Sequence, residues 1–143
     1  MDVHDRCSGA LIETLAVDDA DAVAAAAARA RVAQAAWDRL GARRRATLLR
    51  LARRVMVRDR AEILSRLERE TGKARFDVVG ELMGVCLDIG GLTRRAPRWL
   101  KRRRVSTRPL IGKRGYVAYR PRGVVGIISP WNAPLNLALG DAI

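Results

Sequence analysis

The chain has 143 residues, 49% of them hydrophobic, so it is long enough to bury one core and is one domain or a piece of a larger one. Its formal net charge of +13 comes from 25 arginines and only three lysines, Lys73, Lys101 and Lys113. The arginines accompany an equally general excess of alanine, which is typical of coding bias in a GC-rich genome. The charge therefore does not by itself indicate a nucleic-acid partner.

The sequence excludes several classes of protein and site. No stretch approaches the roughly 18 apolar residues of a membrane span, and the first residues carry acids where a signal peptide has a basic start, so we expect a cytoplasmic protein without a membrane partner. Cys7 and Cys86 lack CxxC spacing and His4 is the only histidine, so no disulfide framework or metal site is predicted. Cys86 lies in an apolar run and is expected to be a buried, inert thiol.

Apolar residues recur at three- and four-residue steps over residues 18–40 and 42–58, which predicts two helices. Asp18, Asp19 and Asp21 stand at the start of the first, where carboxylates cap free N–H groups. The arginines of the second helix are predicted to form a solvated face. The positions expected on the buried faces are Val23, Ala26, Ala30, Ala33, Trp37 and Leu40 in the first helix, and Leu48, Leu51, Ala52 and Val55 in the second.

Two further helices follow. Asp59 and Glu62 resemble a capping box, which predicts the start of a third helix that ends at Gly72, since glycine readily adopts the left-handed conformation. A fourth helix is predicted from about residue 74, and Pro97 should end or kink it. The residues expected on their buried faces are Ile63, Leu64 and Leu67, then Val78, Leu82, Val85, Ile89 and Leu92.

The pattern changes after residue 104 to short runs punctuated by glycine and proline. Residues 115–120 alternate enough to predict an exposed strand, whereas residues 124–128 are a continuous apolar run typical of a buried parallel strand. A turn over residues 129–134 then leads into a helix from residue 135 to residue 143. Strand, loop and helix in this order begin a doubly wound α/β domain, although a single parallel strand has no sheet to enter.

The turn after the apolar run combines features of a site. Pro130 and Pro134 fix the backbone on both sides of Trp131 and Asn132. A carboxamide N–H aimed at a carbonyl oxygen can stabilise an oxyanion. From the residues alone, the favoured interpretation is a rigid connection with a buried Trp131 and a helix-capping Asn132, and a functional site is the alternative.

Residues 121–135 read P-R-G-V-V-G-I-I-S-P-W-N-A-P-L, which resembles the aldehyde dehydrogenase segment P-x-G-V-V-G-x-I-x-P-W-N-x-P-L at every fixed position. Residues 70–73, E-T-G-K, are similar to the sequence that ends an early helix in that family. The alanine-rich first helix with Trp37 and the arginine-rich second helix also resemble its opening layout. The resemblance runs from about residue 17 to the C-terminus.

This resemblance implies an incomplete α/β fold. After a mobile N-terminus over residues 1–16, it implies helices over about residues 18–100 and an oligomerisation strand over about 114–121. Residues 123–143 would then begin the Rossmann-type NAD(P)-binding sheet with its first strand, loop and helix.

Site roles follow from the same resemblance. Asn132 would be the catalytic oxyanion-hole asparagine, and Ile128, Ser129, Pro130 and Trp131 would line the NAD or NADP crevice of the complete enzyme. In the family, a cysteine thiolate attacks the aldehyde and a glutamate activates the water that hydrolyses the thioester. The family places both residues C-terminal to the positions covered here, so these 143 residues alone are expected to be inactive.

Substrate and partners are implied more coarsely. Residues 109–114 and 128–132 resemble the succinate-semialdehyde dehydrogenase branch, which implies a small aldehyde substrate and, for the complete enzyme, a homo-oligomer. Two alternatives stay open. The chain could be a non-catalytic interaction fragment whose strand joins a full-length paralogue. It could instead be a basic nucleic-acid-binding protein around residues 94–104, although no nucleic-acid fold signature accompanies those arginines, so we do not expect nucleic acid as the partner.

Overall fold

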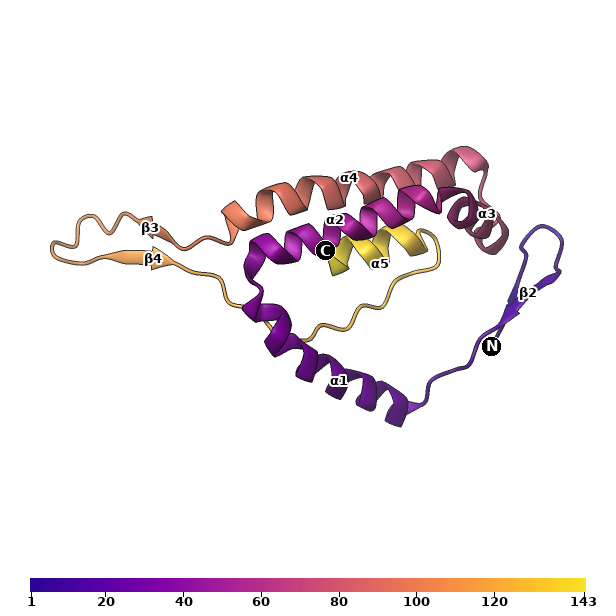
Figure 1. Cartoon of the computed structure of the whole chain (residues 1–143), viewed down its shortest axis with the longest axis horizontal. Coiled ribbons are helices and arrows are strands. Elements are labelled where there is room, and N and C mark those ends of the chain that lie inside the picture. Colours follow the sequence, from indigo (N-terminus) through magenta and orange to yellow (C-terminus); the bar gives the residue numbers. More distant parts are fainter.

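Two long helices, α2 (Gly41–Arg58) and α4 (Arg75–Trp99), run antiparallel through the centre of the structure, a computed structural model that describes residues 1–143 (Figure 1). The shorter helix α3 (Arg60–Thr71) turns the chain back between them. Their apolar side chains meet in one small core, because the buried face of α4 packs on both other helices. The core residues are Met56, Leu64, Leu67, Val78, Leu82, Val85 and Ile89.

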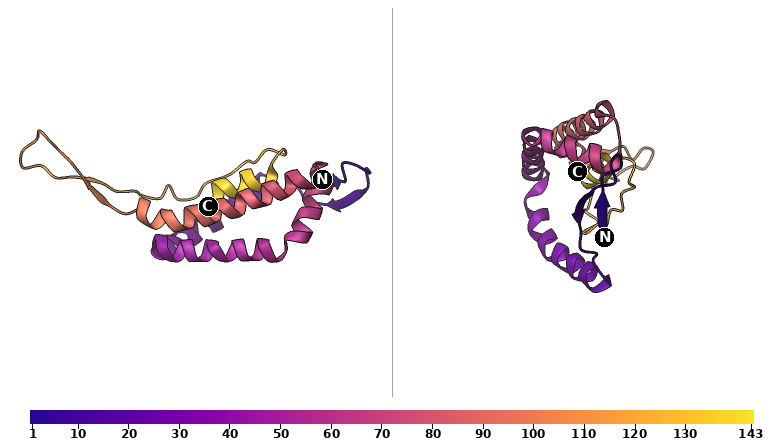
Figure 2. Two further views of the ribbon diagram at one scale, coloured as in Figure 1. Left: turned by 90° about the horizontal axis from the view of Figure 1, so that it is seen from above. Right: turned by 90° about the vertical axis from the view of Figure 1, so that its right-hand side faces the viewer.

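Two further helices join this centre differently. Helix α5 (Pro134–Ala142) lies along α4 and packs Leu135 and Leu139 against the core (Figure 2). Helix α1 (Ala20–Arg39) instead leads away from the bundle and contains no buried residue (Figure 1). Asp19 caps α1 as predicted, since its side chain accepts a hydrogen bond from the Ala22 N–H at 2.8 Å. The predicted apolar face of α1 therefore exists but has almost nothing to pack on within these residues.

The buried face of α2 differs from the predicted one. Leu48, Leu51 and Val55 are exposed, whereas Ala46 and Met56 are buried against α4. Helix α2 carries apolar residues on two faces, and periodicity alone does not say which of them a neighbour covers. The face that was predicted to be buried is left open to solvent in this chain.

The ends of α3 and α4 bear on three features predicted from the sequence. Gly72 ends α3 with φ of 70°, as predicted. The predicted capping box is wrong, because the Asp59 carboxylate binds the Arg58 guanidinium at 2.6 Å and makes no cap hydrogen bond. Pro97 lies in the last turn of α4, which continues to Trp99 rather than stopping before the proline.

Two antiparallel hairpins extend from the helices (Figures 1 and 2). Strands β3 (Arg103–Val105) and β4 (Gly115–Val117) form one that projects from the end of α4, so the predicted strand is shorter than expected. Strands β1 (Asp2–His4) and β2 (Leu11–Thr14) form the other within the segment predicted to be mobile. No pattern in the sequence indicates this second hairpin, which is joined to α3 by a hydrogen bond from the Arg6 N–H to the Arg69 carbonyl at 2.8 Å.

The predicted buried strand over residues 124–128 is absent from the structure. These residues form no strand and are exposed, and the Ile128 side chain is fully so. A parallel strand needs neighbouring strands for its hydrogen bonds, and residues 1–143 place none beside this segment. The fold described by these residues is therefore a mostly helical α/β fragment.

Candidate functional site

The loop of residues 129–133 connects the extended segment to α5 (Figure 1). Pro134 occupies the first turn of α5, where its fixed φ is already helical and its missing N–H is not needed. Trp131 is 82% exposed and Asn132 is exposed beside it. The alternative of a buried Trp131 is thus not what the structure has.

Asn132 does not cap the helix that follows it. The N-cap residue of α5 is Ala133, and it has no side-chain cap. The Asn132 side chain takes part in no hydrogen bond of the structure. Its carboxamide is therefore free to donate to a ligand.

The cap of α5 comes from α4 instead. Glu81 Oε1 accepts hydrogen bonds from the backbone N–H groups of Leu135 and Asn136 at 2.9 and 3.2 Å. Glu81 Oε2 accepts one from Lys73 Nζ at 2.7 Å. The carboxylate is buried on the same face of α4 as Val78 and Leu82. Sequence reasoning missed Glu81, although an acid on an otherwise apolar helix face was a signal for it.

The turn after α3 places Lys73 for this contact. Thr71 Oγ1 donates to the Leu67 carbonyl at 2.6 Å and accepts from the Lys73 N–H at 3.3 Å, and Gly72 supplies the left-handed residue between them. The E-T-G-K segment therefore forms a rigid corner whose lysine points to Glu81. The E-T-G-K segment and the first residues of α5 thus meet at the Glu81 carboxylate.

The residues proposed to line the cofactor crevice lie together on the open side of the loop. Ile128, Pro130 and Trp131 are exposed and Ser129 is half-buried. They form an uncovered, largely apolar surface with one aromatic ring. No cluster of three or more metal-ligating side chains occurs in the structure.

The two cysteines lie elsewhere. Cys7 is exposed in the N-terminal hairpin, and Cys86 is half-buried on α4 against the core. Burial raises the pKa of the Cys86 thiol, and the nearby positive charge of Arg53 opposes this only in part. A thiol that holds its proton more tightly is a weaker nucleophile at neutral pH.

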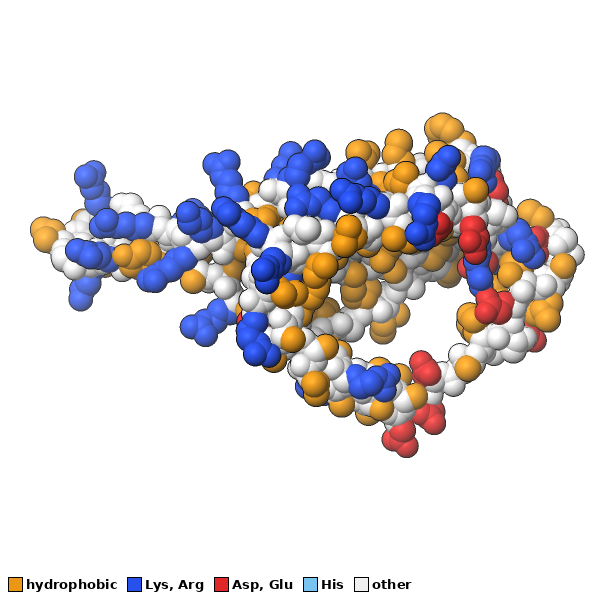
Figure 3. Space-filling view, in the orientation of Figure 1, with side chains coloured by type: hydrophobic (Ala, Val, Ile, Leu, Met, Phe, Trp, Pro, Cys, Tyr) orange, Lys and Arg blue, Asp and Glu red, His pale blue; other side chains and the backbone are white.

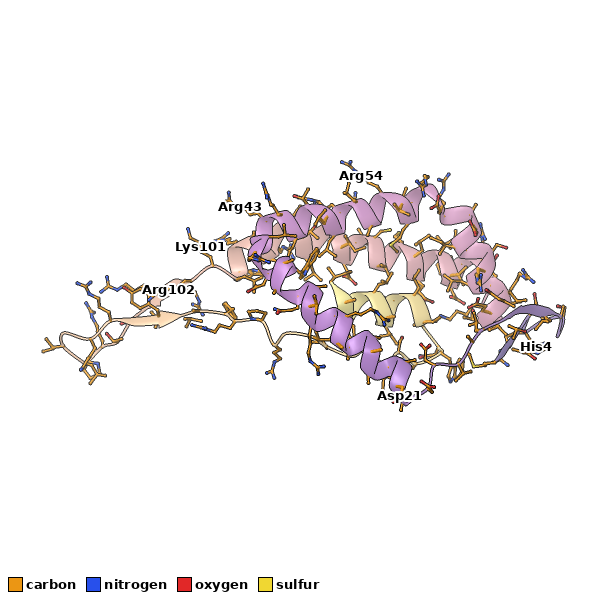
Figure 4. All side chains as sticks on the ribbon, turned by 60° about the horizontal axis from the view of Figure 1, so that its bottom comes forward. His4, Asp21, Arg43, Arg54, Lys101 and Arg102 are labelled. Carbon is orange, nitrogen blue, oxygen red and sulfur yellow. The ribbon has the colours of Figure 1, made fainter.

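Basic side chains gather on the surface of α2, α4 and the β3–β4 hairpin (Figure 3). Figure 4 shows Arg43, Arg54 and Lys101 along this side. A groove of about 640 Å³ between α2 and α4 contains five cationic side chains, none of them in an ion pair, namely Arg43, Arg50, Arg94, Arg98 and Lys101. Such a surface attracts polyanions without regard to their sequence. None of the helices is both long and apolar enough to cross a membrane.

Comparison with known proteins places the whole chain in one family. The family profile described as "Aldehyde dehydrogenase family" matches residues 1–143. A protein of Mycobacterium ulcerans provisionally named succinate-semialdehyde dehydrogenase [NADP(+)] 2 is 36% identical over 137 residues, which are 95% of this chain and 26% of that protein. A provisionally named succinate-semialdehyde dehydrogenase [NADP(+)] of Mycolicibacterium smegmatis is 34% identical over 141 residues, which are 99% of this chain and 27% of that protein.

Solved structures agree. An NAD-dependent benzaldehyde dehydrogenase from Corynebacterium glutamicum superposes with a TM-score of 0.85 at 28% identity, over 96% of this chain and 30% of that chain. An NADP-dependent enzyme of E. coli gives a TM-score of 0.87 at 27% identity, over 96% of this chain and 28% of that chain. The chain spans about a quarter of the length of the curated relatives it matches. It belongs to the aldehyde dehydrogenase family and corresponds to an N-terminal portion of it.

Proposed function

We propose that this chain forms the N-terminal part of an NAD(P)-dependent oxidoreductase that converts an aldehyde to a carboxylic acid, and that Asn132 belongs to its oxyanion hole. The observation that carries the proposal is the free carboxamide of Asn132 on a proline-bounded loop at the start of α5. Family membership supplies the reaction class.

The chemistry asked of Asn132 is electrostatic. When a nucleophile adds to an aldehyde, the carbonyl oxygen gains negative charge, and an amide N–H already aimed at it stabilises that charge. Removal of one such donor costs about 3–4 kcal/mol in comparable sites. A side chain that must give up no other hydrogen bond is suited to this task, and Asn132 has none to give up.

The exposed surface of residues 128–131 fits a nicotinamide cofactor. Ile128 and Trp131 offer apolar and aromatic area for its rings, while Ser129 offers a hydroxyl between two rigid residues. NAD or NADP, when bound, supplies the hydride acceptor. Relatives carry both cofactors in their names, so either fits the proposal.

Succinate semialdehyde is the proposed aldehyde. Its support is that relatives from two mycobacterial genera, matched over nearly the whole chain, bear the name of enzymes for that substrate. The site would then bind an aliphatic aldehyde that carries a carboxylate, rather than an aromatic aldehyde.

We propose that residues 1–143 alone are catalytically inert. Cys7 lies in the N-terminal hairpin, and the Cys86 thiol is half-buried with a raised pKa, so neither provides a ready thiolate nucleophile. The nucleophile and the general base would come from other parts of the complete enzyme, which we propose to be a homo-oligomer.

A second candidate is a non-catalytic interaction role. The β3–β4 hairpin projects from the helices and leaves an edge of β4 unpaired (Figure 2). Such an edge can add to the sheet of another chain through its backbone. The partner would be a full-length member of the same family.

The test uses a chimera in which this chain replaces the matching N-terminal quarter of the M. ulcerans relative. The matched pair of variants is Asn132→Ala and Asn136→Ala, because both remove a carboxamide near the start of α5. We expect Asn132→Ala to lower kcat about 10²- to 10³-fold and Asn136→Ala to change it little. Equal kcat values for the two variants would contradict the role of Asn132.

The interaction role has its own readout. If the isolated chain co-purifies with the parent relative and alters its oligomer, while the chimera has no activity, the second candidate replaces the first.

A further inference from the structure

Glu81 is a buried carboxylate of α4 that accepts three hydrogen bonds from two other segments of the chain. Its side chain is 4% exposed. It accepts two backbone hydrogen bonds from α5 and one from Lys73, which stands in the turn between α3 and α4. A charge taken out of water is strongly destabilising unless it is paired and hydrogen-bonded, so these three contacts allow the Glu81 carboxylate to be buried.

Helix α5 depends on this contact. It has nine residues and no side-chain cap of its own. A helix this short is marginal without tertiary support, because its nucleation is unfavourable and its first N–H groups lack partners. Glu81 satisfies two of those groups and places a negative charge at the positive end of the helix.

Lys73 holds the carboxylate from the opposite side. Its position follows from the α3 corner, where Gly72 and Thr71 fix the backbone on which it stands. Lys73 and Glu81 form the most buried ion pair of the structure, and the six other pairs lie nearer the surface. The E-T-G-K corner is thereby connected through one carboxylate to the helix that follows Asn132.

We propose that Glu81 is a positioning residue that fixes the start of α5 and with it the loop bearing Trp131 and Asn132, and that Lys73 keeps the Glu81 carboxylate in place. The loop has few other anchors, since Trp131 and Asn132 are exposed and Ala133 makes no cap. The effect expected on catalysis rests on the proposed function. The tether, meaning the hydrogen bonds from Leu135 and Asn136 to Glu81, does not.

The tether is tested in the chain as it stands, by amide hydrogen exchange at Leu135 and Asn136. Glu81→Leu should speed their exchange about tenfold or more, whereas Glu81→Gln, which retains one acceptor oxygen, should have a smaller effect. Lys73→Met should act in the same direction and Lys73→Arg should preserve protection.

The matched control is Glu68→Gln, because Glu68 is ion-paired with Arg75 at 2.9 Å but contacts no residue of α5. Amides on the core face of α4, at Val85 and Ile89, report global stability in every variant. If Glu81→Gln and Glu81→Leu leave Leu135 and Asn136 as protected as in the unchanged chain, the tether is overturned. Equal loss of protection over α4 and α5 would also overturn the tether. Glu81 would then stabilise the whole helical bundle and would have no specific effect on the start of α5.

Fluorescence of Trp131 gives an independent readout of the loop. With Trp37→Phe and Trp99→Phe in the background, Trp131 is the only tryptophan, and excitation that spares the two tyrosines reports on it alone. We expect Glu81→Gln to change its emission or anisotropy and Glu68→Gln to leave both unchanged. An unchanged signal in Glu81→Leu would contradict the claim that Glu81 fixes the loop.

Kinetics of the chimera separate the two proposals. Glu81→Gln should lower kcat with little change in KM, and Glu68→Gln should change neither. If Glu81→Leu frees the α5 amides but Asn132→Ala leaves kcat intact, the tether stands and the proposed function of Asn132 fails. If Asn132→Ala lowers kcat but the Glu81 variants leave exchange of the α5 amides unchanged, the positioning role of Glu81 fails and the proposed function of Asn132 stands.

Discussion

At the scale of single residues, Gly72 has a role that no other residue type can fill cheaply. Its φ of 70° lies in the left-handed region, and a Cβ added there would come within 3.1 Å of the Arg6 Cβ. The residue both ends α3 and sets the direction of Lys73. A side chain at this position would strain the corner on which the Glu81 contact depends.

We expect Gly72→Ala to lower the free energy of unfolding by about 1–2 kcal/mol, because alanine is disfavoured at positive φ. The matched control is Gly80→Ala within α4, where an added Cβ meets nothing within 4 Å. That control should stabilise the chain by about 0.5–1 kcal/mol, since alanine is the better helix former. Urea unfolding of the two variants checks both signs, and a Gly72→Ala variant as stable as the unchanged chain would disprove the strain.

The Cys86 thiol offers a second test at this scale. Burial raises its pKa, so the thiolate forms at higher pH in the folded chain than in the unfolded one. In a Cys7→Ser background, the pH at which the alkylation rate of Cys86 reaches half its maximum should therefore be higher in buffer than in urea. The pH is higher in buffer because folding favours the neutral thiol. For the same reason, the free energy of unfolding should fall as the pH becomes alkaline. Identical pH profiles in buffer and urea would contradict the burial of this thiol.

At the scale of elements, the sequence predicts a buried helix or strand correctly when the segments that pack against it lie within these 143 residues. The buried face of α4, with Val78, Leu82 and Val85, was predicted correctly because its neighbours all lie within these 143 residues. The strand over residues 124–128 was predicted wrongly because these residues have no strand beside them with which to form a sheet. The local sequence indicates that a segment is suited to burial, but whether it is buried depends on the other segments that pack against it.

The candidate site shows the same division. Residues 128–132 could be singled out from the sequence because prolines, an aromatic and a carboxamide stand within a few positions. Glu81 could not be joined to them, because it is 54 positions before Leu135 and no local pattern connects the two. A contact that long depends on how α4 and α5 pack, which periodicity does not specify.

Residues 124–128 should become a strand when their partners are supplied. In the isolated chain we expect their amides to exchange freely, since they form no strand. In the chimera with the M. ulcerans relative they should gain protection, because a parallel neighbour can take up their hydrogen bonds. Hydrogen exchange followed by mass spectrometry compares the two, with the already helical residues of α4 as the reference. Free exchange in an active chimera would contradict this assignment.

At the scale of the whole molecule, the chain exposes more surface than its size requires. Its accessible surface is 11365 Å², whereas a compact monomer of 15.8 kDa exposes about 7,300 Å². Only 11 of 143 residues are buried, so the excess of about 4,000 Å² is surface that the helices and hairpins leave uncovered. An excess of this size is comparable to an obligate interface.

Denaturant unfolding should report this open shape. The slope of unfolding free energy against urea concentration scales with the surface newly exposed, which is small in a chain already this exposed. We expect a slope clearly below that of compact domains of equal length. A slope equal to theirs would mean that the isolated chain closes on itself in solution.

The most direct test of the central claim is aldehyde-dependent reduction of NAD and NADP, measured for the isolated chain and for its chimera with the M. ulcerans relative. We predict no reduction by the chain alone, and reduction by the chimera with succinate semialdehyde as substrate. A folded chimera without activity, beside an active parent relative, or reduction by the chain alone, would contradict the account.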